Sequence, residues 1–356
     1  VITAISPPGL ALAAATPMTI TGTNFSTTLA DNFVFFDGLK ATLTQATATQ
    51  LSFTAPNLVK DSIKVRVSVL GATDFSNTML YRLDAAVTSF GALGTLDQPY
   101  SATCDTAGNV YVSLTTNGAG IGVKKFTPAG VKTDYSPAVG TRWTGMKIGP
   151  GGYLYAARTL AALYRIPPGG GTATIWLAFG GLGTVFDFDF DSQGNLWGVG
   201  NDVAISRVKQ DLSIKTFPFV ANARTARVYN GYLYVGALKD TVEAIWRFNI
   251  VSADSLGPVE KYFDMSAYGV PGTGPNAITF SSDNYMYVGI NGPDGIILVR
   301  PDKTWEKYYQ GLFTPTVGYF AWSNGSGLFS CNQNAGATTL KKINTQKSSA
   351  PYYGRQ

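Results

Sequence analysis

The feature that most constrains the fold is a short unit that recurs six times after the first eighty residues. Each copy has a turn rich in Gly, Asn, Asp or Ser, followed by a strand with an aromatic residue at one fixed position. A repeat of about this length forms one supersecondary unit that buries its apolar face only by stacking on its neighbours. The aromatic residues lie 37 to 53 positions apart and are Tyr111, Tyr155, Trp197, Tyr234, Tyr287 and Phe329.

The spacing of these units predicts a ring of six four-stranded blades, which is a β-propeller. Such a ring must close on itself, and two segments compete for the closing position. Residues 85–94 have the pattern of an outer strand but precede the first inner strand, so we expect them to join the sixth blade. The terminal segment 350–355, APYYGR, is the alternative.

The composition also favours an all-β chain. Only 14% of the 356 residues are charged, 13% are aromatic and 40 are glycine, as expected for many short strands and turns. No segment keeps a 3.6-residue apolar period or approaches the length of a membrane span, so we expect no membrane insertion. The chain starts at Val1 without a signal-like core, which suggests a mature form whose targeting segment has been removed.

The first eighty residues have a different pattern, with about seven short strands separated by turn residues. The clearest strand is DSIKVRVSVLG at 61–71, where apolar side chains alternate with Lys64, Arg66 and Ser68. This alternation is typical of a half-buried antiparallel strand. Many short alternating strands at this density favour a β-sandwich.

Both parts resemble known families. Within residues 1–83, the strings ISP, TITGTNF, VFFDG and IKVRVSV resemble an IPT/TIG domain, which implies an immunoglobulin-like sandwich. The segments 97–113 and 274–289 resemble NHL and gluconolactonase-like propellers, an architecture that hosts lactonases, lyases, receptors and scaffolds. We therefore predict a sandwich over residues 1–83 and a six-bladed propeller over 84–356.

The sequence VFDFDFDSQGNLW at 185–197 places three carboxylates on one side of an inner strand. Asp191 matches the turn aspartate of the repeat, so we interpret it as a turn residue. Asp187 and Asp189 are predicted to lie near the central channel, with Lys147 level with Asp189.

Blade four brings Arg224 and Arg227 towards these carboxylates, which favours a girdle of ion pairs between blades. The alternative is a structural Ca²⁺ held by Asp187, Asp189 and Asn276, because calcium takes several oxygen ligands. We expect no other cofactor.

The absence of histidine argues against an enzyme, since it removes imidazole bases and imidazole metal ligands. The lactonases of this architecture bind a metal at the channel mouth, and Asn276 falls on their Asn position. Their acidic position at the start of blade one and their Asp in blade four have no counterpart here. A divergent lactonase-like hydrolase therefore remains a minor alternative.

Two cysteines have two interpretations. Cys104 lies on the inner strand of blade one and Cys331 on the second strand of blade six, which are neighbours in a closed ring. They form either a disulfide that staples the ring or two buried thiols.

Several short motifs suggest glycosylation. Asp-Ser/Thr-apolar motifs resemble bacterial O-glycosylation sites, and Asn24 and Asn324 begin N-glycosylation sequons. The O-glycosylation candidates are Ser62, Thr106, Thr241 and Ser255.

The 27 Lys and Arg residues are scattered, which argues against nucleic-acid binding. We predict a secreted or surface-exposed bacterial binding or adhesion protein whose propeller contacts a protein or glycan. The segment 249–276 is the expected place for a partner contact. The first alternative is self-association as a subunit of an extracellular filament or a phage or cell appendage.

Overall fold

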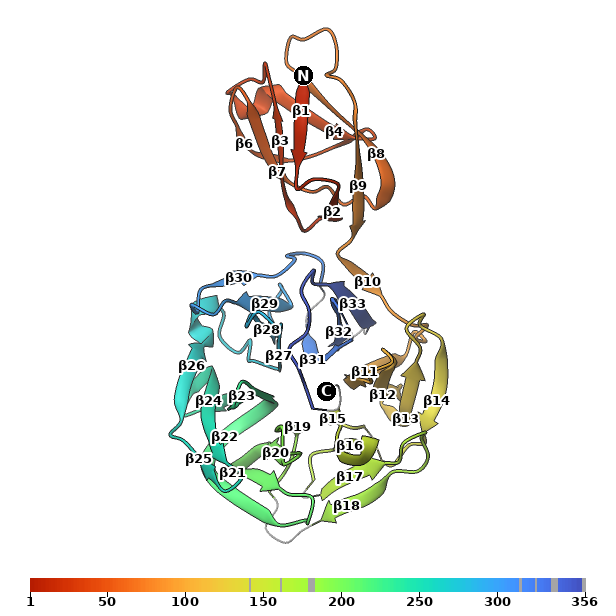
Figure 1. The fold of residues 1–356 in the computed structure, drawn as a ribbon, viewed down its shortest axis with the longest axis vertical. Helices are drawn as coiled ribbons and strands as arrows, with labels where there is room; N and C mark the ends of the chain where they lie inside the picture. Colours follow the sequence, from red (N-terminus) through yellow and green to blue (C-terminus); the bar gives the residue numbers. More distant parts are fainter. Residues whose placement is uncertain are drawn as a thin grey trace. The chain divides into compact units, whose positions relative to one another are not determined.

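The computed structural model describes residues 1–140, 142–160, 162–178, 183–313, 316–323, 325–333 and 339–353, apart from the side chain of Asp202. The chain divides into two compact units, Val1–Thr88 and Ser89–Gln356. Strands dominate both units, and the described residues contain three short 3₁₀ turns as their only helical segments (Figure 1). The fold is therefore all-β, as predicted.

The first unit is a sandwich of two sheets around one apolar core. Its first sheet has the order β1 (Ile2–Ser6), β3 (Pro17–Gly22), β7 (Gln50–Thr54) and β6 (Leu43–Ala46). Its second sheet has the order β2 (Leu10–Ala13), β9 (Met79–Ala85), β8 (Lys60–Val69), β4 (Asn32–Phe36) and β5 (Leu39–Lys40).

Strand β8 shows why this sequence forms a sandwich. Ile63, Val65 and Val67 are buried, whereas the polar residues between them face outwards. Val67 pairs with Val34 and Val65 with Phe36 on the antiparallel strand β4, so both strands turn apolar side chains to the same core.

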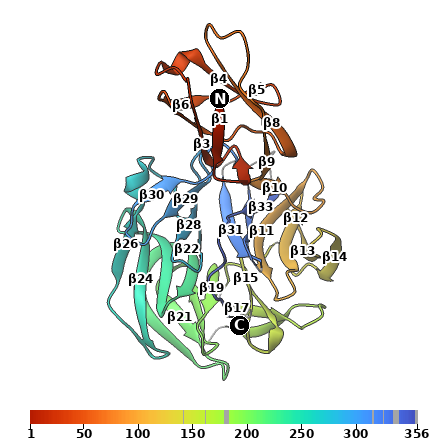
Figure 2. The same cartoon turned by 45° about the horizontal axis from the view of Figure 1, so that its top comes forward.

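The second unit is a ring of six blades, each an antiparallel sheet (Figures 1 and 2). Blade one is β11 (Asp97–Cys104), β12 (Val110–Thr116), β13 (Ala119–Phe126) and β14 (Lys132–Ser136). Blade two is β15 (Gly145–Ile148), β16 (Leu154–Ala157), β17 (Ala162–Ile166) and β18 (Thr174–Ala178). Blade five is β27 (Ala277–Phe280), β28 (Met286–Gly289), β29 (Ile296–Val299) and β30 (Trp305–Lys307).

Blades three and four share one continuous strand. Blade three contains β19 (Asp187–Phe190), β20 (Leu196–Val199), β21 (Asn201–Val208) and the first half of β22 (Ile214–Tyr229). The second half of β22 is the innermost strand of blade four, which continues with β23 (Tyr232–Lys239), β24 (Val242–Ser252) and β26 (Glu260–Asp264). A short strand, β25 (Ser255–Leu256), forms a hairpin with the end of β24.

An early segment closes the ring, as expected. Blade six has β31 (Val317–Trp322), β32 (Gly327–Asn332), β33 (Thr339–Asn344) and, as its outermost strand, β10 (Val87–Ser89). The backbone N–H of Phe90 donates to the carbonyl of Leu340 at 2.8 Å. Since the sixth sheet holds strands from both ends of the propeller sequence, separating the blades requires breaking this pairing.

In blades one and three, an aspartate fixes the turn before the aromatic strand. Asp191 accepts hydrogen bonds from the backbone N–H groups of Gln193 and Asn195, and from the indole N–H of Trp197 at 2.9 Å. Asp105 has the same role in blade one. The turn interpretation of Asp191 is confirmed, and the buried Trp197 is anchored by its polar edge as well as by packing.

We predict that Asp191→Ala lowers the free energy of unfolding by about 2–4 kcal/mol, because buried N–H donors lose a charged acceptor. Urea denaturation measures this change. The control is Asp302→Ala, which removes an exposed turn aspartate that caps Thr304, and it should cost less than about 1 kcal/mol. Equal losses for the two variants would contradict the anchoring role.

Candidate functional site

The six innermost strands run in the same direction around the channel and contact one another. Each begins at one end, here called the mouth, and finishes at the opposite end, here called the base. The channel therefore has three levels, namely residues that precede or begin these strands, residues in the strand centres, and residues at the strand ends. The strands are β11, β15, β19, the second half of β22, β27 and β31.

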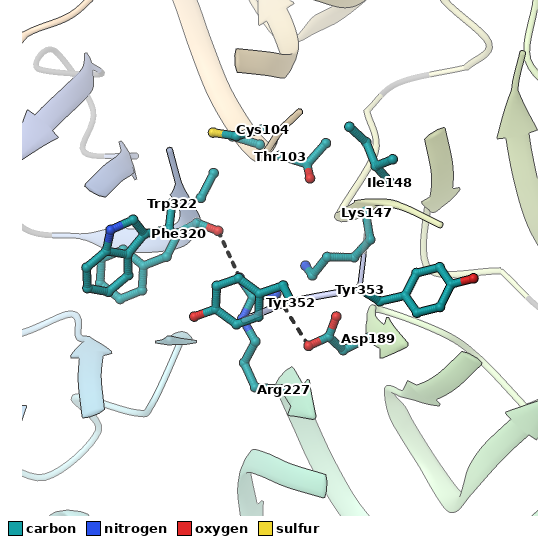
Figure 3. Close-up of a pocket in the computed structure, with 12 residues that line it drawn as sticks. Thr103, Cys104, Lys147, Ile148, Asp189, Arg227, Phe320, Trp322, Tyr352 and Tyr353 are labelled. Carbon is teal, nitrogen blue, oxygen red and sulfur yellow. Dashed lines mark hydrogen bonds and ion pairs between the residues drawn. The ribbon is translucent and has the colours of Figure 1, made fainter. Parts of the chain in front are cut away.

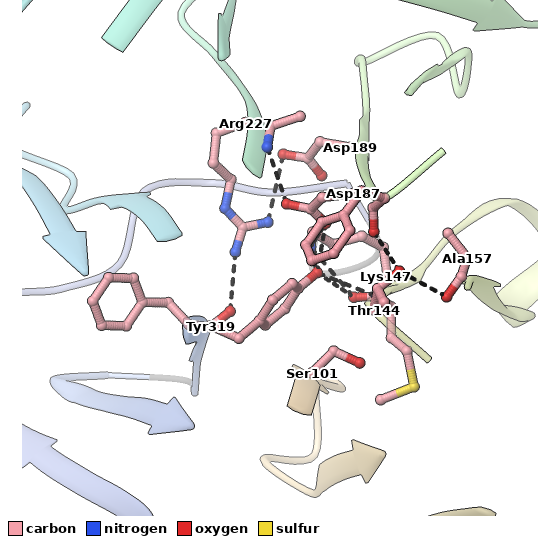
Figure 4. Close-up of polar contacts among 12 residues, drawn as sticks. Ser101, Thr144, Lys147, Ala157, Asp187, Asp189, Arg227 and Tyr319 are labelled. Carbon is pink, nitrogen blue, oxygen red and sulfur yellow. Dashed lines mark hydrogen bonds and ion pairs between the residues drawn. The ribbon is translucent and has the colours of Figure 1, made fainter. Parts of the chain in front are cut away.

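The central level is built around the buried carboxylate of Asp187 (Figure 4). One carboxylate oxygen accepts the Tyr319 hydroxyl at 2.9 Å and lies 3.6 Å from the ammonium nitrogen of Lys147. The other accepts the backbone N–H of Ala226 at 3.0 Å. Lys147 also donates to the Tyr319 hydroxyl. The cluster joins blades two, three, four and six.

A second buried pair lies one step along the same strand. Asp189 accepts the backbone N–H of Val228 at 3.0 Å and lies 3.7 Å from the guanidinium of Arg227. Arg227 donates to the carbonyls of Ile278 at 3.0 Å and Phe320 at 3.2 Å. These contacts reach blades five and six, so the guanidinium connects four blades.

The structure places the predicted girdle residues in two groups. Lys147, Asp187, Asp189 and Arg227 come together at the central level, although the closest carboxylate to Lys147 is Asp187 rather than the expected Asp189. Arg224 lies apart from them at the mouth. Sequence reasoning missed Tyr319, because its position in the repeat is not aromatic in the other blades.

Burial sets the protonation behaviour of this cluster. Desolvation lowers the pKa of Lys147 to about 8, and the charge of Arg227 acts in the same direction against the two carboxylates. Desolvation raises the pKa of the Asp189 carboxyl and outweighs Arg227 and Lys147. Burial, reinforced by the Asp187 charge, raises the pKa of Tyr319, so its hydroxyl stays a donor.

The base of the channel is filled by the C-terminal segment (Figure 3). The Tyr352 hydroxyl bonds to Thr279 at 2.5 Å and to the backbone of Phe280 at 3.0 Å. The ring of Tyr353 packs against Phe190, and Arg227 lies 5.0 Å from the centre of the Tyr352 ring. Only about 30 Å³ remains between this segment and the central level, which is room for one or two water molecules.

The role of 350–355 therefore differs from the alternative considered for it. Its described residues, 350–353, do not form an outer strand of blade six. They follow a backbone bond between Ser282 and Ser348 and cross the base of the channel from blade five towards blade three. Residues 354 and 355 lie outside the described residues.

The mouth holds a pocket of about 180 Å³ to which every blade contributes. Two arginines and two aromatic rings stand beside side-chain amides and hydroxyls. No carboxylate is among the described lining residues. They are Tyr100, Arg142, Thr144, Phe186, Arg224, Asn276, Asn291, Thr316, Gly318 and Gln333.

The two arginines of this pocket are held differently. Arg224 lies 3.6 Å from a carboxylate oxygen of Glu243 and 3.4 Å from the amide oxygen of Asn276. Gly274 has a φ of 59°, and a Cβ there would lie 2.1 Å from the Arg224 guanidinium. The positive φ favours glycine here, and any other side chain would displace the end of the Arg224 side chain.

Arg142 lies over the ring of Tyr100, 4.2 Å from its centre. Within the described part of the chain it has no ion pair. Its guanidinium therefore retains most of its hydrogen-bonding capacity.

The metal set of the lactonases does not fit this mouth. Asn276, the position shared with them, turns its amide oxygen towards the Arg224 guanidinium and donates to Asn291 at 2.7 Å. Asp187 and Asp189 lie deeper and already accept protein hydrogen bonds. The described residues include no group of three or more His, Cys, Asp or Glu side chains able to hold a metal. A cation beside Asn276 would be repelled by the guanidinium of Arg224.

The two cysteines are free, buried thiols, so the second of the two interpretations is confirmed and they form no disulfide. Burial, reinforced by the neighbouring Cys104, raises the pKa of the Cys331 thiol. Both side chains pack in the core between blades one and six.

The glycosylation candidates within the described residues lie on the surface. Asn24 is exposed, whereas Asn324 lies outside the described residues. Modification of these residues stays a prediction. The exposed O-glycosylation candidates are Ser62, Thr106, Thr241 and Ser255.

The predicted partner-contact segment 249–276 contains the end of β24, β25, β26 and the 3₁₀ turn η3 (Met265–Tyr268). Part of it lines a shallow groove of about 630 Å³ with the β23–β24 hairpin. The groove is lined by residues of 238–243 and 264–272.

Comparison with known proteins supports both halves of the architecture. Residues 1–82 match the model of the IPT/TIG domain. No curated protein matches the chain.

Three solved structures with similar folds cover most of the chain. An auxiliary nutrient binding protein from Bacteroides ovatus is 12% identical, with a TM-score of 0.58, over 96% of this chain and 97% of that chain. A catalytically inactive virginiamycin B lyase from Staphylococcus aureus with quinupristin is 13% identical, with a TM-score of 0.51, over 73% and 88%. Regucalcin from Agrobacterium tumefaciens, a calcium-binding protein, is 12% identical, with a TM-score of 0.58, over 75% and 94%.

These findings define the class of protein. Residues 1–82 match an IPT/TIG domain, and the second unit is a six-bladed β-propeller whose fold resembles those of the nutrient binding protein and the lyase. The described residues form no helix that is long and apolar enough to cross a membrane.

We predict that Lys147 makes stability rise between about pH 8 and pH 10. Below pH 8 the lysine is protonated in both states, whereas above it the folded state releases the proton that the unfolded state, with a pKa near 10.5, still binds. The stability difference between the wild type and Lys147→Met should therefore shift in favour of the wild type by up to about 1.4 kcal/mol per pH unit.

Urea denaturation of both proteins at pH 7.5, 8.5 and 9.5 measures this shift, with Lys303→Met as an exposed control. A constant difference across the three pH values would show that Lys147 does not release its proton in this range.

Proposed function

We propose that this chain is an exported, non-catalytic binding protein that takes a small polar ligand into the mouth pocket. The observation that carries the proposal is the convergence of all six blades on one polar pocket. Ligand pockets are concave, with a few placed polar groups among apolar ones, and here Tyr100 and Phe186 supply the apolar surface.

The closed channel behind the pocket supports binding rather than passage. The central ion pairs and the C-terminal segment leave space only for water between mouth and base. A ligand that enters the mouth therefore stays there, bound by the residues that line the mouth pocket.

The residue types of the mouth support a non-catalytic role. The similar lyase structure is an inactive variant in which a histidine is replaced by alanine, and this chain has no histidine. The mouth offers arginines, amides and hydroxyls, but no described carboxylate, thiol or imidazole to act as a base. The name of the Bacteroides ovatus protein, an auxiliary nutrient binding protein, is consistent with a ligand-binding role.

The alternatives have less support. The predicted partner is a glycan or a protein at the cell surface. Because the pocket measures about 180 Å³, it can bind only a small ligand or the end of a larger one. Assembly into a filament or appendage stays a prediction.

We predict that Thr316→Trp abolishes binding of the physiological ligand, because the indole would fill the pocket that Thr316 lines. A thermal-shift screen of sugars, sugar acids, amino acids, nucleosides and short peptides identifies stabilising ligands of the wild-type protein. Calorimetry then compares the variants, with Thr133→Trp on the exposed strand β14 as the matched control.

The expected result is loss of binding in Thr316→Trp and unchanged binding in Thr133→Trp. Ligands that bind Thr316→Trp as well as the wild type would place the site elsewhere, with the groove at 264–272 as the next candidate.

A further inference from the structure

The mouth pocket carries a positive charge, and no carboxylate among its described lining residues neutralises it. Arg142 and Arg224 both line the pocket. Glu243 lies behind Arg224 and offsets one of the two charges, while the nearest channel carboxylate, Asp187, is already bonded by Tyr319 and Ala226. The pocket therefore attracts an anion.

The two guanidiniums differ in what they offer this anion. Arg224 is held by Glu243 and Asn276, so its position is preorganised. Arg142 is exposed and stacked on Tyr100, with its donors directed to no described carboxylate. A planar guanidinium binds a carboxylate through two parallel hydrogen bonds, which a lysine in the same place would not provide.

The rest of the lining matches a sugar ring rather than a bare ion. Phe186 lies on blade three, between the blades that carry the arginines, and provides an apolar face. Asn276, Asn291 and Gln333 bring amide groups from blades five and six, which suit hydroxyls as donors and acceptors. The volume of about 180 Å³ is below the usual range of about 300–1,000 Å³ for drug-sized ligands, so one ring enters.

We propose that the mouth pocket binds a uronic acid, as a free sugar or as the end of an oligosaccharide, with its carboxylate between Arg142 and Arg224. The inference rests on the proposed function of the pocket and adds the chemical class of the ligand. The sugar ring packs against Phe186, and its hydroxyls face the amides of blades five and six.

The test is calorimetric titration of the full chain with galacturonate, glucuronate, mannuronate and guluronate, each as monomer and as oligomers of two to four units. The fully methyl-esterified forms of the same sugars are the matched neutral ligands. We expect at least one acid to bind at least about tenfold more tightly than its ester, because the ester loses the charge-assisted hydrogen bonds. Binding should weaken as NaCl rises from 25 to 300 mM.

Variants of the two arginines test whether the ligand carboxylate binds between them. Arg142→Gln and Arg224→Gln should each weaken binding by about tenfold or more, and Arg142→Lys should lie between the wild type and Arg142→Gln. The control is Arg300→Gln, since Arg300 pairs with Glu306 in blade five away from the mouth and should leave affinity unchanged. Circular dichroism confirms that each variant is folded.

Each outcome separates this inference from the proposed function. If no uronate binds, or if acid and ester bind equally, the uronic acid assignment is wrong. The mouth pocket then remains the binding site provided that another ligand is lost in Thr316→Trp. If uronates bind but neither arginine variant weakens them, the anion lies outside this pocket and the assignment is also wrong. If no ligand depends on Thr316, both proposals fail.

Discussion

Two buried aspartates on one strand constrain the whole channel. Asp187 and Asp189 sit at the centre of the ring, where an unpaired carboxylate would cost several kcal/mol. Their side-chain partners come from other blades. Lys147 lies on blade two, Arg227 on blade four and Tyr319 on blade six. Each donor is correctly placed only when its blade is in position. The buried carboxylates are therefore fully bonded only when the blades have their native arrangement.

The same arrangement divides the channel by function. The central charges use their hydrogen-bonding capacity on one another and on backbone groups, so they offer little to a ligand. Tyr352 and Tyr353 fill the base. Binding capacity therefore remains at the mouth, where the guanidinium of Arg142 still has free donors. A closed interior and an open polar mouth together favour the proposed binding of a ligand at the mouth.

The sequence was most informative where a pattern repeats. The aromatic anchors, the turn aspartates and the alternation of β8 each recur or extend over several residues, so strand order, blade number and the closing strand were predictable. Aligning the inner strands brought Lys147, Asp187, Asp189 and Arg227 into one girdle, but it did not show which cation pairs with which carboxylate. The mouth pocket could not be predicted, because Arg142 and Phe186 precede their strands in loops that have no period.

Other details depended on geometry that spacing does not encode. Lys147 reaches Asp187 rather than Asp189, since the donor to each carboxylate is set by the relative height of neighbouring strands. Tyr319 was missed because a single tyrosine in an apolar strand resembles a core residue. The C-terminal APYYGR has the composition of a strand, yet the Tyr352 hydroxyl bonds to Thr279 in the channel base.

The central claim is that ligand binds at the mouth, and hydrogen–deuterium exchange with and without the strongest ligand from the screen tests it most directly. We expect slower exchange for backbone amides at 142–145, 222–226 and 316–319, where blades two, four and six begin their inner strands. Unchanged exchange there, with protection at 264–272 or in the first unit, would contradict it.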